Sequence, residues 1–270
     1  MFNALLAAAI ATAPPSVHAN AQPLAEDASP AMFVVRDEDT TVYIFGTFHA
    51  LDGKSDWFKD RVRAAFEGSD ELILETVIPE GPVKLKPTAF GGQPLPVTPS
   101  ASFLATTRMA ITAGKSQGMQ VGNGADNVLR HVAEAQGKPV EGLETLELQL
   151  SMFSRMPAAA TSRPPKAGQP VDDGGSQMQS LTDAMGAMQA AWKHGDQSVF
   201  VKMLSQLEKA SPDTYRVMFT ERNARWADWI AGRMQTPGTV FVAVGAGHLA
   251  GKDSVLVHLA QLGITSARLN

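Results

Sequence analysis

The chain contains no cysteine, and this absence removes several kinds of chemistry at once. Disulfide bonds, thiolate metal sites and a cysteine nucleophile are all excluded. No cluster of lysine and arginine offsets the formal net charge of -4, which argues against binding of nucleic acid. The chain also lacks a Gly-x-Ser-x-Gly elbow, a His-Glu-x-x-His helix, a phosphate-binding loop and a dinucleotide fingerprint, so none of these motifs explains its function.

The sequence also lacks an apolar run of the ~20 residues that a membrane-spanning helix needs. A shorter apolar run from Ala4 to Ala13 precedes the small-x-small pattern Ala19-Asn20-Ala21, which is typical of a signal peptide. No Lys or Arg precedes Arg36, which is unusual for such a segment. We expect residues 1–21 to be a signal peptide, the mature chain to have no transmembrane segment, and the protein to be periplasmic or secreted. A disordered alanine-rich tail is the alternative.

Two apolar segments near opposite ends of the chain finish in the same pattern. Tyr43-Ile44-Phe45 leads into Gly46-Thr47-Phe48-His49, and Val242-Ala243-Val244 leads into Gly245-Ala246-Gly247-His248. Ligands of α/β proteins collect at the carboxyl ends of strands, where a histidine can bind a metal ion or transfer a proton. We therefore predict one composite site, built on strands that are neighbours or near neighbours at one sheet edge. The alternative is two core histidines bonded to nearby backbone.

The glycines of this pattern have an expected role of their own. Glycine adopts backbone conformations that are closed to other residues. We expect Gly46 and Gly245 to use this freedom where the chain leaves each strand, so that the backbone can approach a ligand closely.

Two glutamates follow strand-like segments in a similar way. Glu71-Leu72-Ile73-Leu74 leads to Glu75, and the segment from Pro139 to Leu143 leads to Glu144. A carboxylate after an apolar strand is expected to be buried and to need a cation or hydrogen-bond donors. Glu75 is therefore predicted to be a metal ligand or a general base, with a structural ion pair as the alternative. Glu144 either accepts a proton in the site or is a first-turn acid of the helix that begins near Leu146.

Two imidazoles and one carboxylate are a common ligand set for a divalent metal ion. His49, Glu75 and His248 are therefore the candidate metal ligands. Nitrogen and oxygen donors without sulfur suit Mn, Co, Zn and Fe, and the sequence does not distinguish among these metals.

Strand-like and helical segments alternate along the chain, which is typical of an α/β protein. We predict a central mixed β-sheet flanked by helices on both faces; the pattern also suggests two diverged half-repeats, each contributing a Gly-x-x-His strand end. Residues 22–270 are expected to form one domain, with a Pro/Gly loop at 79–99 and a flexible connector around 157–175. The predicted elements are a hairpin at 32–45, strands at 71–77, 139–143 and 266–269, and helices at 57–66, 102–113, 126–135, 146–152, 177–192, 213–234 and 254–262. Asp126 is the expected N-cap of its helix.

Several motifs, in order along the chain, resemble the TraB/GumN family. They are Gly46 to Leu51 with Trp57, Leu72 to Thr76, Lys138 to Thr145 with Gln149, Glu221 to Asn223 with Trp226, and Gly238 to Gly251. Together they span nearly all of the mature chain. The family includes bacterial proteins linked to polysaccharide biosynthesis, the Tiki metalloproteases and plasmid proteins that inhibit a peptide pheromone.

The resemblance implies an active site made of His49, Glu75, Arg222 and His248. In this site the guanidinium of Arg222 would bind a carboxylate or stabilise charge that develops in the reaction. The alternative for Arg222 is a surface or inter-helix salt bridge. The Pro/Gly loop and the connector depart from the family pattern, so the resemblance does not imply the substrate.

Three functions are compatible with these observations. The first is an exported metal-dependent hydrolase, with a peptide or protein as substrate and Glu144 or Glu75 as proton acceptor. The second is a periplasmic protein that binds a peptide or a cell-envelope glycan without turnover and is linked to polysaccharide biosynthesis. The third is a metal-free esterase in which His49 or His248 activates water.

Overall fold

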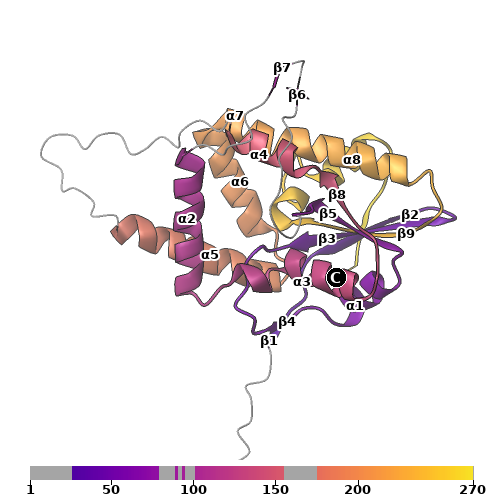
Figure 1. Cartoon of the computed structure of the whole chain (residues 1–270), viewed down its shortest axis with the longest axis horizontal. Helices are drawn as coiled ribbons and strands as arrows, with labels where there is room; N and C mark the ends of the chain where they lie inside the picture. The colour runs from indigo at the N-terminus through magenta and orange to yellow at the C-terminus, as the bar shows by residue number, and fades with distance from the viewer. Residues whose placement is uncertain (1–25, 79–88, 91–92, 95–100, 155–174, 270) are drawn as a thin grey trace, which may run out of the picture.

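A six-stranded mixed sheet forms the centre of the structure, a computed structural model that describes residues 26–78, 89–90, 93–94, 101–154 and 175–269 (Figure 1). The strand order is β10-β2-β3-β9-β5-β8, where the strands are β2 (Met32–Arg36), β3 (Thr40–Thr47), β5 (Glu71–Thr76), β8 (Val140–Glu144), β9 (Gly238–Gly245) and β10 (Ala267–Arg268). β3, β9, β5 and β8 are parallel, whereas β2 is antiparallel to both β3 and β10. The α/β fold, its mixed sheet and the hairpin of β2 and β3 are confirmed.

Helices cover both faces of this sheet, as predicted. One group packs on the sheet face that carries Ile44 and Val242, and it consists of α8 (Glu221–Arg233) and α9 (Val255–Gln261). The other group packs on the face that carries Phe45 and Phe241, and it consists of α1 (Asp60–Glu67), α3 (Ala125–Ala135), α5 (Gly175–Lys193) and α6 (Ser198–Ala210). Figure 1 shows α8 on one side of the sheet and α1 and α3 on the other.

Most of the predicted elements are present. The helix predicted at 102–113 is α2 (Ala101–Ser116), and the one predicted at 146–152 is α4 (Leu146–Ser154). The long helix predicted at 213–234 is present as one continuous helical segment made of α7 (Pro212–Tyr215), a π-helical turn η2 (Arg216–Thr220) and α8. α6 was not predicted. Short elements complete the structure: β1 (Glu26–Asp27), β4 (Ser55–Asp56), β6 (Ala89–Phe90), β7 (Gln93–Pro94), η1 (Val121–Asn123) and η3 (Ala246–Leu249).

Some predicted segments lie outside the described residues. These are the signal peptide at 1–21, most of the loop at 79–99 and the connector at 157–175 except Gly175, which begins α5. The duplication into half-repeats stays a hypothesis, because β3 follows a hairpin strand whereas β9 follows a helix. None of the helices in the described part of the chain is long and apolar enough to cross a membrane.

Candidate functional site

The two Gly-x-x-His segments lie side by side at one edge of the sheet. β3 pairs in parallel with β9, and Thr47 lies opposite Gly245 at the end of the pairing. The prediction that the strands leading to His49 and His248 are neighbours is therefore confirmed. β5 pairs with the other side of β9 and brings Glu75 to the same edge.

Gly245 provides the space around which these side chains converge. A Cβ atom added to Gly245 would lie 3.1 Å from Glu75 Oε1, 3.4 Å from His49 Nε2 and 3.6 Å from His248 Cδ2. Its φ of -53° and ψ of 136° are open to any residue, and Gly46 has no positive φ either. The expectation that these glycines adopt special backbone conformations is therefore wrong. Gly245 is needed because a side chain would fill the gap between the three functional groups.

Both carboxylate oxygens of Glu75 accept short hydrogen bonds. Arg222 Nη2 donates to Oε2 at 2.7 Å, and the backbone N–H of Gly245 donates to Oε1 at 2.7 Å. Burial favours the neutral acid, but the charge of Arg222, the neighbouring histidines and the Gly245 N–H together outweigh it and hold the pKa of Glu75 well below its usual range. Glu75 is therefore an anion at neutral pH and a weak base.

Arg222 is buried at the centre of a charged network. Besides its bond to Glu75, its Nε donates to Glu144 Oε2 at 2.9 Å, and its Nη1 lies 3.3 Å from His248 Nε2. The guanidinium carbon lies 4.5 Å from the centre of the Trp226 ring, a cation–π contact. The two carboxylates raise the pKa of Arg222 although burial opposes its charge. Arg222 therefore forms structural salt bridges, and the functional role predicted for it stays a prediction.

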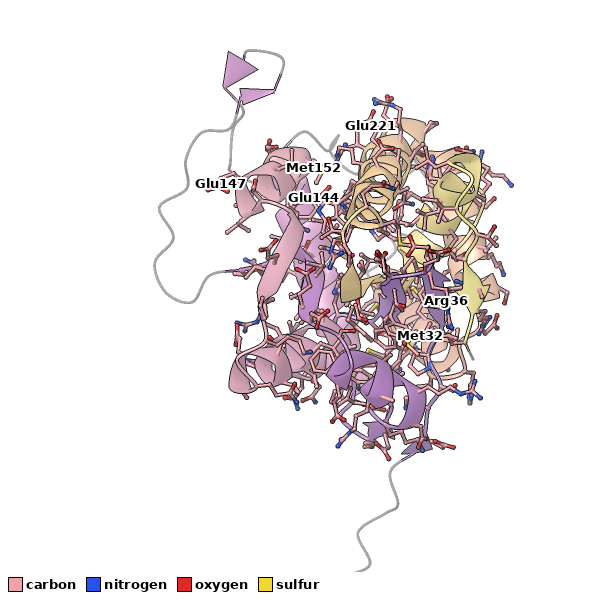
Figure 2. The ribbon with its side chains drawn as sticks, turned by 90° about the vertical axis from the view of Figure 1, so that its right-hand side faces the viewer. Met32, Arg36, Glu144, Glu147, Met152 and Glu221 are labelled. Atoms are coloured by element: carbon pink, nitrogen blue, oxygen red, sulfur yellow. The ribbon has the colours of Figure 1, made fainter. Side chains whose placement is uncertain are left out.

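Glu144 is held by two arginines. Its Oε2 accepts from Arg222, and its Oε1 accepts from Arg225 Nη2 at 3.0 Å. The side chain is only 1% exposed and lies where β8 ends beside α4, which carries Glu147 and Met152 (Figure 2). This environment favours a role in fixing Arg222. The catalytic role predicted for Glu144 stays a prediction.

His248 is a buried neutral imidazole with a defined tautomer. Asn223 Nδ2 donates to the carbonyl of Asp253 at 2.6 Å, which leaves Asn223 Oδ1 to accept from His248 Nδ1 at 2.6 Å. Nδ1 therefore carries the hydrogen, and the lone pair of Nε2 faces Arg222. Burial, followed by the repulsion from Arg222, lowers the pKa of His248 to about 3. Asn223 belongs to one of the motifs that carry the family resemblance, but no role was predicted for it.

His49 is the member of the site that solvent and a substrate can reach, because its side chain is 62% exposed. Its Nδ1 lies 3.3 Å from Asp126 Oδ1, at the start of α3. Burial opposes its charge, but the neighbouring carboxylate of Asp126, together with Glu75, raises the pKa of His49 to about 9. Solvent screens part of this attraction because the ring is largely exposed. His49 is thus mainly an imidazolium ion at neutral pH.

Asp126 is not the helix cap that the sequence predicted. α3 begins at Ala125, and Gly124 is its N-cap. The backbone N–H of Ala125 donates to the carbonyl of Phe48 at 3.0 Å, which fixes the start of α3 beside the His49 segment. Asp126, in the first turn, is therefore directed at His49. In the sequence, an aspartate at this position cannot be distinguished from a cap.

The three predicted metal ligands meet at one place, but their side chains are not spaced as the ligands of a bound metal ion. Imidazole and carboxylate are suitable donors, and His248 Nε2 lies 3.8 Å from Glu75 Oε1. Arg222 contacts both groups, however, so a metal cation between them would lie against a permanent positive charge. Across the ranges that the structure describes, no three His, Asp or Glu side chains are grouped closely enough to hold a metal ion.

The fold and the site together define a class of α/β protein with histidines, a glutamate and an arginine assembled where parallel strands end. The sequence model of the TraB/PrgY/gumN family matches residues 31–90 and 88–268. The chain therefore belongs to the TraB/PrgY/gumN family, as the resemblance of its motifs indicated. Comparison with curated proteins and with solved structures gave no match.

Proposed function

We propose that the protein is a hydrolase that acts on a peptide or protein at the edge formed by the ends of β3, β9 and β5. The observation that carries this proposal is the pairing of His49 with Asp126 beside the buried charges of Glu75 and Arg222. An imidazole with a carboxylate on one nitrogen and an accessible second nitrogen is the arrangement of a general base. His248 is buried and Glu75 is a weak base, so His49, in the fraction that has lost its proton, is the group best placed to activate water.

The other residues position this base and shape its electric field. Glu75 and Arg222 are fixed charges that do not titrate near neutral pH, because each lowers the energy of the other's charged form. Glu144 holds Arg222, and Asn223 holds the tautomer of His248. Such preorganised charges stabilise charge that develops in a reaction without needing to reorient.

Hydrolysis of a set of fluorescence-quenched peptides by the mature chain tests this function. His49→Ala should lower kcat/KM by roughly 10²–10⁴-fold, which is the contribution of a general base. His131→Ala on the exposed side of α3 is the matched control and should behave as the wild type. Equal rates for His49→Ala and the wild type would overturn the proposal. Tight binding of a peptide or glycan that stays intact, and that depends on His49, would support the non-catalytic alternative.

A metal-dependent form of the hydrolase is the second candidate. The convergence of His49, Glu75 and His248 around Gly245 and their donor chemistry favour it, whereas the position of Arg222 opposes it. Metal content and activity after chelation decide between the two forms. Restoration of activity by one of Mn, Co, Zn or Fe would establish the metal-dependent form. Full activity of metal-free protein would exclude it.

We also propose that the protein is exported. The support is the apolar segment from Ala4 to Ala13 and the Ala19-Asn20-Ala21 pattern. Mass spectrometry of the native protein should give an N-terminus near Asn20 or Gln22. An intact Met1 in the cytosolic fraction would contradict export.

A further inference from the structure

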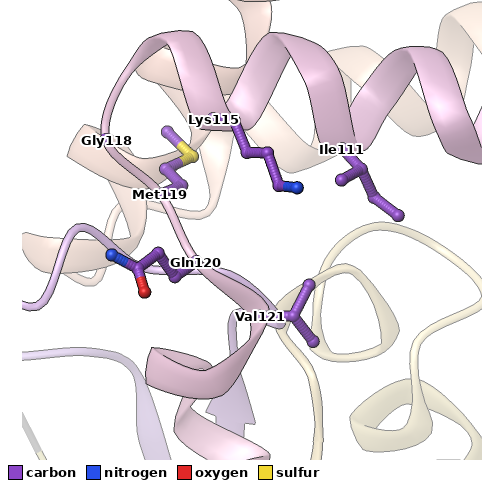
Figure 3. A pocket seen from close by; sticks show the side chains of 6 residues that line it. All are labelled: Ile111, Lys115, Gly118, Met119, Gln120 and Val121. Atoms are coloured by element: carbon purple, nitrogen blue, oxygen red, sulfur yellow. The ribbon is translucent and has the colours of Figure 1, made fainter.

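A pocket lies where α2 ends and the chain turns into η1 (Figure 3). It encloses about 530 Å³, which is within the range of ~300–1,000 Å³ that is usual for ligand sites. The residues that line it are Ile111, Lys115, Gly118, Met119, Gln120 and Val121. None of them belongs to the charged network around Arg222.

The wall of this pocket is joined to the segment that carries His49. Gln120 and Leu51 exchange two backbone hydrogen bonds, at 2.9 and 3.2 Å. Two residues before Leu51 is His49, and beyond η1 the chain enters α3 with Asp126 in its first turn. Asp126 is five positions after Val121 in the chain, so their Cα atoms are at most about 18 Å apart. A ligand in the pocket is therefore within a few peptide units of the His49–Asp126 pair.

The pocket combines exposed apolar surface with one positive charge. Ile111 is 41% exposed and Val121 is 56% exposed, and these are two of the few large apolar side chains on the surface of the described residues. The Lys115 ammonium has no ion-pair or hydrogen-bond partner among the residues whose placement the structure describes. Figure 3 shows the side chains of all three residues directed into the same gap. Met119, which is buried, belongs to the same lining and lies next to Gly118.

This chemistry defines the ligand that the pocket fits. Apolar side chains favour an apolar group of the ligand, because its burial removes both surfaces from water. Lys115 favours a carboxylate at the edge of that group, since its ammonium would gain a charge-assisted hydrogen bond. A peptide supplies both within one or two residues, and an extended peptide of about five residues spans the distance to His49.

We propose that this pocket binds an apolar residue of the substrate peptide together with an adjacent carboxylate, and thereby selects the substrate. This inference rests on the proposed hydrolase function. The carboxylate belongs either to the C-terminus of the peptide or to a neighbouring acidic side chain. Lys115 would bind either carboxylate in the same way, so peptides that carry only one of the two distinguish the sources.

Binding is measured first, with the full chain carrying His49→Ala so that the peptides stay intact. Three N-terminally labelled peptides serve as probes: Ala-Ala-Leu-Leu with a free carboxylate, the same peptide as its amide, and Ala-Ala-Glu-Leu as its amide. A carboxylate-bearing peptide should bind roughly tenfold more tightly than the neutral amide, the size of a hydrogen bond to a charged group. Which of the two does so identifies the source of the carboxylate.

Substitutions then locate the bound peptide. Lys115→Ala should abolish the preference for the carboxylate. Val121→Ser should weaken the binding of all three peptides by several-fold. The matched controls are Lys202→Ala and Val201→Ser, neighbouring exposed residues on α6, which should leave binding unchanged. The inference would be overturned if Lys115→Ala and Lys202→Ala changed the peptide affinity equally, or if the peptides bound equally well with and without a carboxylate.

Turnover with His49 restored separates this inference from the proposed function. Lys115→Ala and Val121→Ser should raise KM for the carboxylate peptide and leave kcat nearly unchanged. Peptides that bind in the predicted order but are never cleaved would refute the hydrolase and leave the pocket assignment intact. Cleavage that is insensitive to both pocket substitutions would refute the pocket assignment and leave the hydrolase intact.

Discussion

His49 and His248 occupy the same position in their sequence motifs, yet their neighbours give them different charges, positive for His49 and zero for His248. His49 is exposed and faces the carboxylate of Asp126, so its pKa is raised to about 9. His248 is buried against Arg222, so its pKa is lowered to about 3. A repeated motif has therefore produced one imidazolium and one neutral imidazole. The residues packed around each imidazole, and not the motif, therefore set its protonation state.

Asp126→Asn should lower the pKa of His49 towards its ordinary value of 6.5, because it removes both the charged acceptor and its field. An NMR titration of the His49 imidazole measures this shift without an activity assay. If His49 is the general base, the rising limb of the pH–rate profile should move to lower pH by the same amount. Asp228→Asn on the exposed side of α8 is the control. An unchanged His49 titration in Asp126→Asn would contradict the pairing.

Gly245→Ala tests the requirement for space at the site. The new Cβ would meet Glu75 Oε1 at 3.1 Å and His49 Nε2 at 3.4 Å, so one of these groups must shift. A displacement of about 1 Å can reduce kcat/KM by ~10²-fold. The shift needed here is only a few tenths of an ångström, so we expect a loss of roughly 3–10-fold in a folded protein. Gly232→Ala, where the added Cβ meets nothing, should keep activity and gain up to ~1 kcal/mol of stability. Equal activity of the two variants would refute the role assigned to Gly245.

The sequence predicted the residues of the site whose position depends on local structure. His49, Glu75 and His248 follow apolar strands, and parallel strands end at one sheet edge, so their convergence follows from the pattern. Asp126 and Asn223 were missed because they reach the histidines only after α3 and α8 dock on the sheet. No spacing in the chain encodes that docking. Arg225, the second arginine that contacts Glu144, was missed for the same reason.

At the scale of elements, α5 secures the end of β3. Trp192 on α5 is buried, and its indole Nε1 donates to the carbonyl of Gly46 at 2.8 Å, at the start of the first Gly-x-x-His segment. The ring also packs against Phe45 and Trp57. Lys193, the next residue, is ion-paired with Asp52 at 3.0 Å. These contacts hold the His49 segment from the sheet face that carries Phe45.

Trp192→Phe should lower the free energy of unfolding by about 1–3 kcal/mol, because it removes the donor to a buried carbonyl. Urea denaturation measures this change. Trp229→Phe is the control, since Trp229 is only partly buried on α8. We expect this substitution to lower the free energy of unfolding by a smaller amount. A loss for Trp192→Phe no larger than for Trp229→Phe would contradict the importance of this hydrogen bond.

The elements themselves were easier to predict than their order in space. The hairpin of β2 and β3 is local, and its alternation of apolar residues and its polar turn are visible in the sequence. The position of β9 between β3 and β5 joins segments far apart in the chain, so the sequence supported only their proximity. The π-helical turn η2 was missed for a similar reason. It places Phe219 with its ring centre 4.8 Å from that of His248, a tertiary contact that periodicity does not report.

At the scale of the whole molecule, the two histidines link folding to pH in opposite directions. The unfolded chain protonates His248 near pH 6.5, whereas the folded chain does so near pH 3. Stability from His248 is therefore complete above pH 6.5 and is lost as the pH falls towards 3. Glu75 adds to this loss below its ordinary pKa of 4.5, because its folded pKa is lower still. Both groups give a stability that rises with pH on the acid side.

His49 acts on the alkaline side, because its folded pKa of about 9 lies above its unfolded value of 6.5. Its contribution is complete below pH 6.5 and is lost as the pH rises through 9. We therefore expect the free energy of unfolding, measured in urea across this range, to be greatest near pH 6.5. The alkaline decrease due to His49 should amount to only ~0.2–1 kcal/mol, because its exposed pair with Asp126 is screened by solvent. Asp126→Asn should flatten the alkaline limb and leave the acid limb unchanged, whereas an alkaline limb that persists in this variant would assign it to other groups.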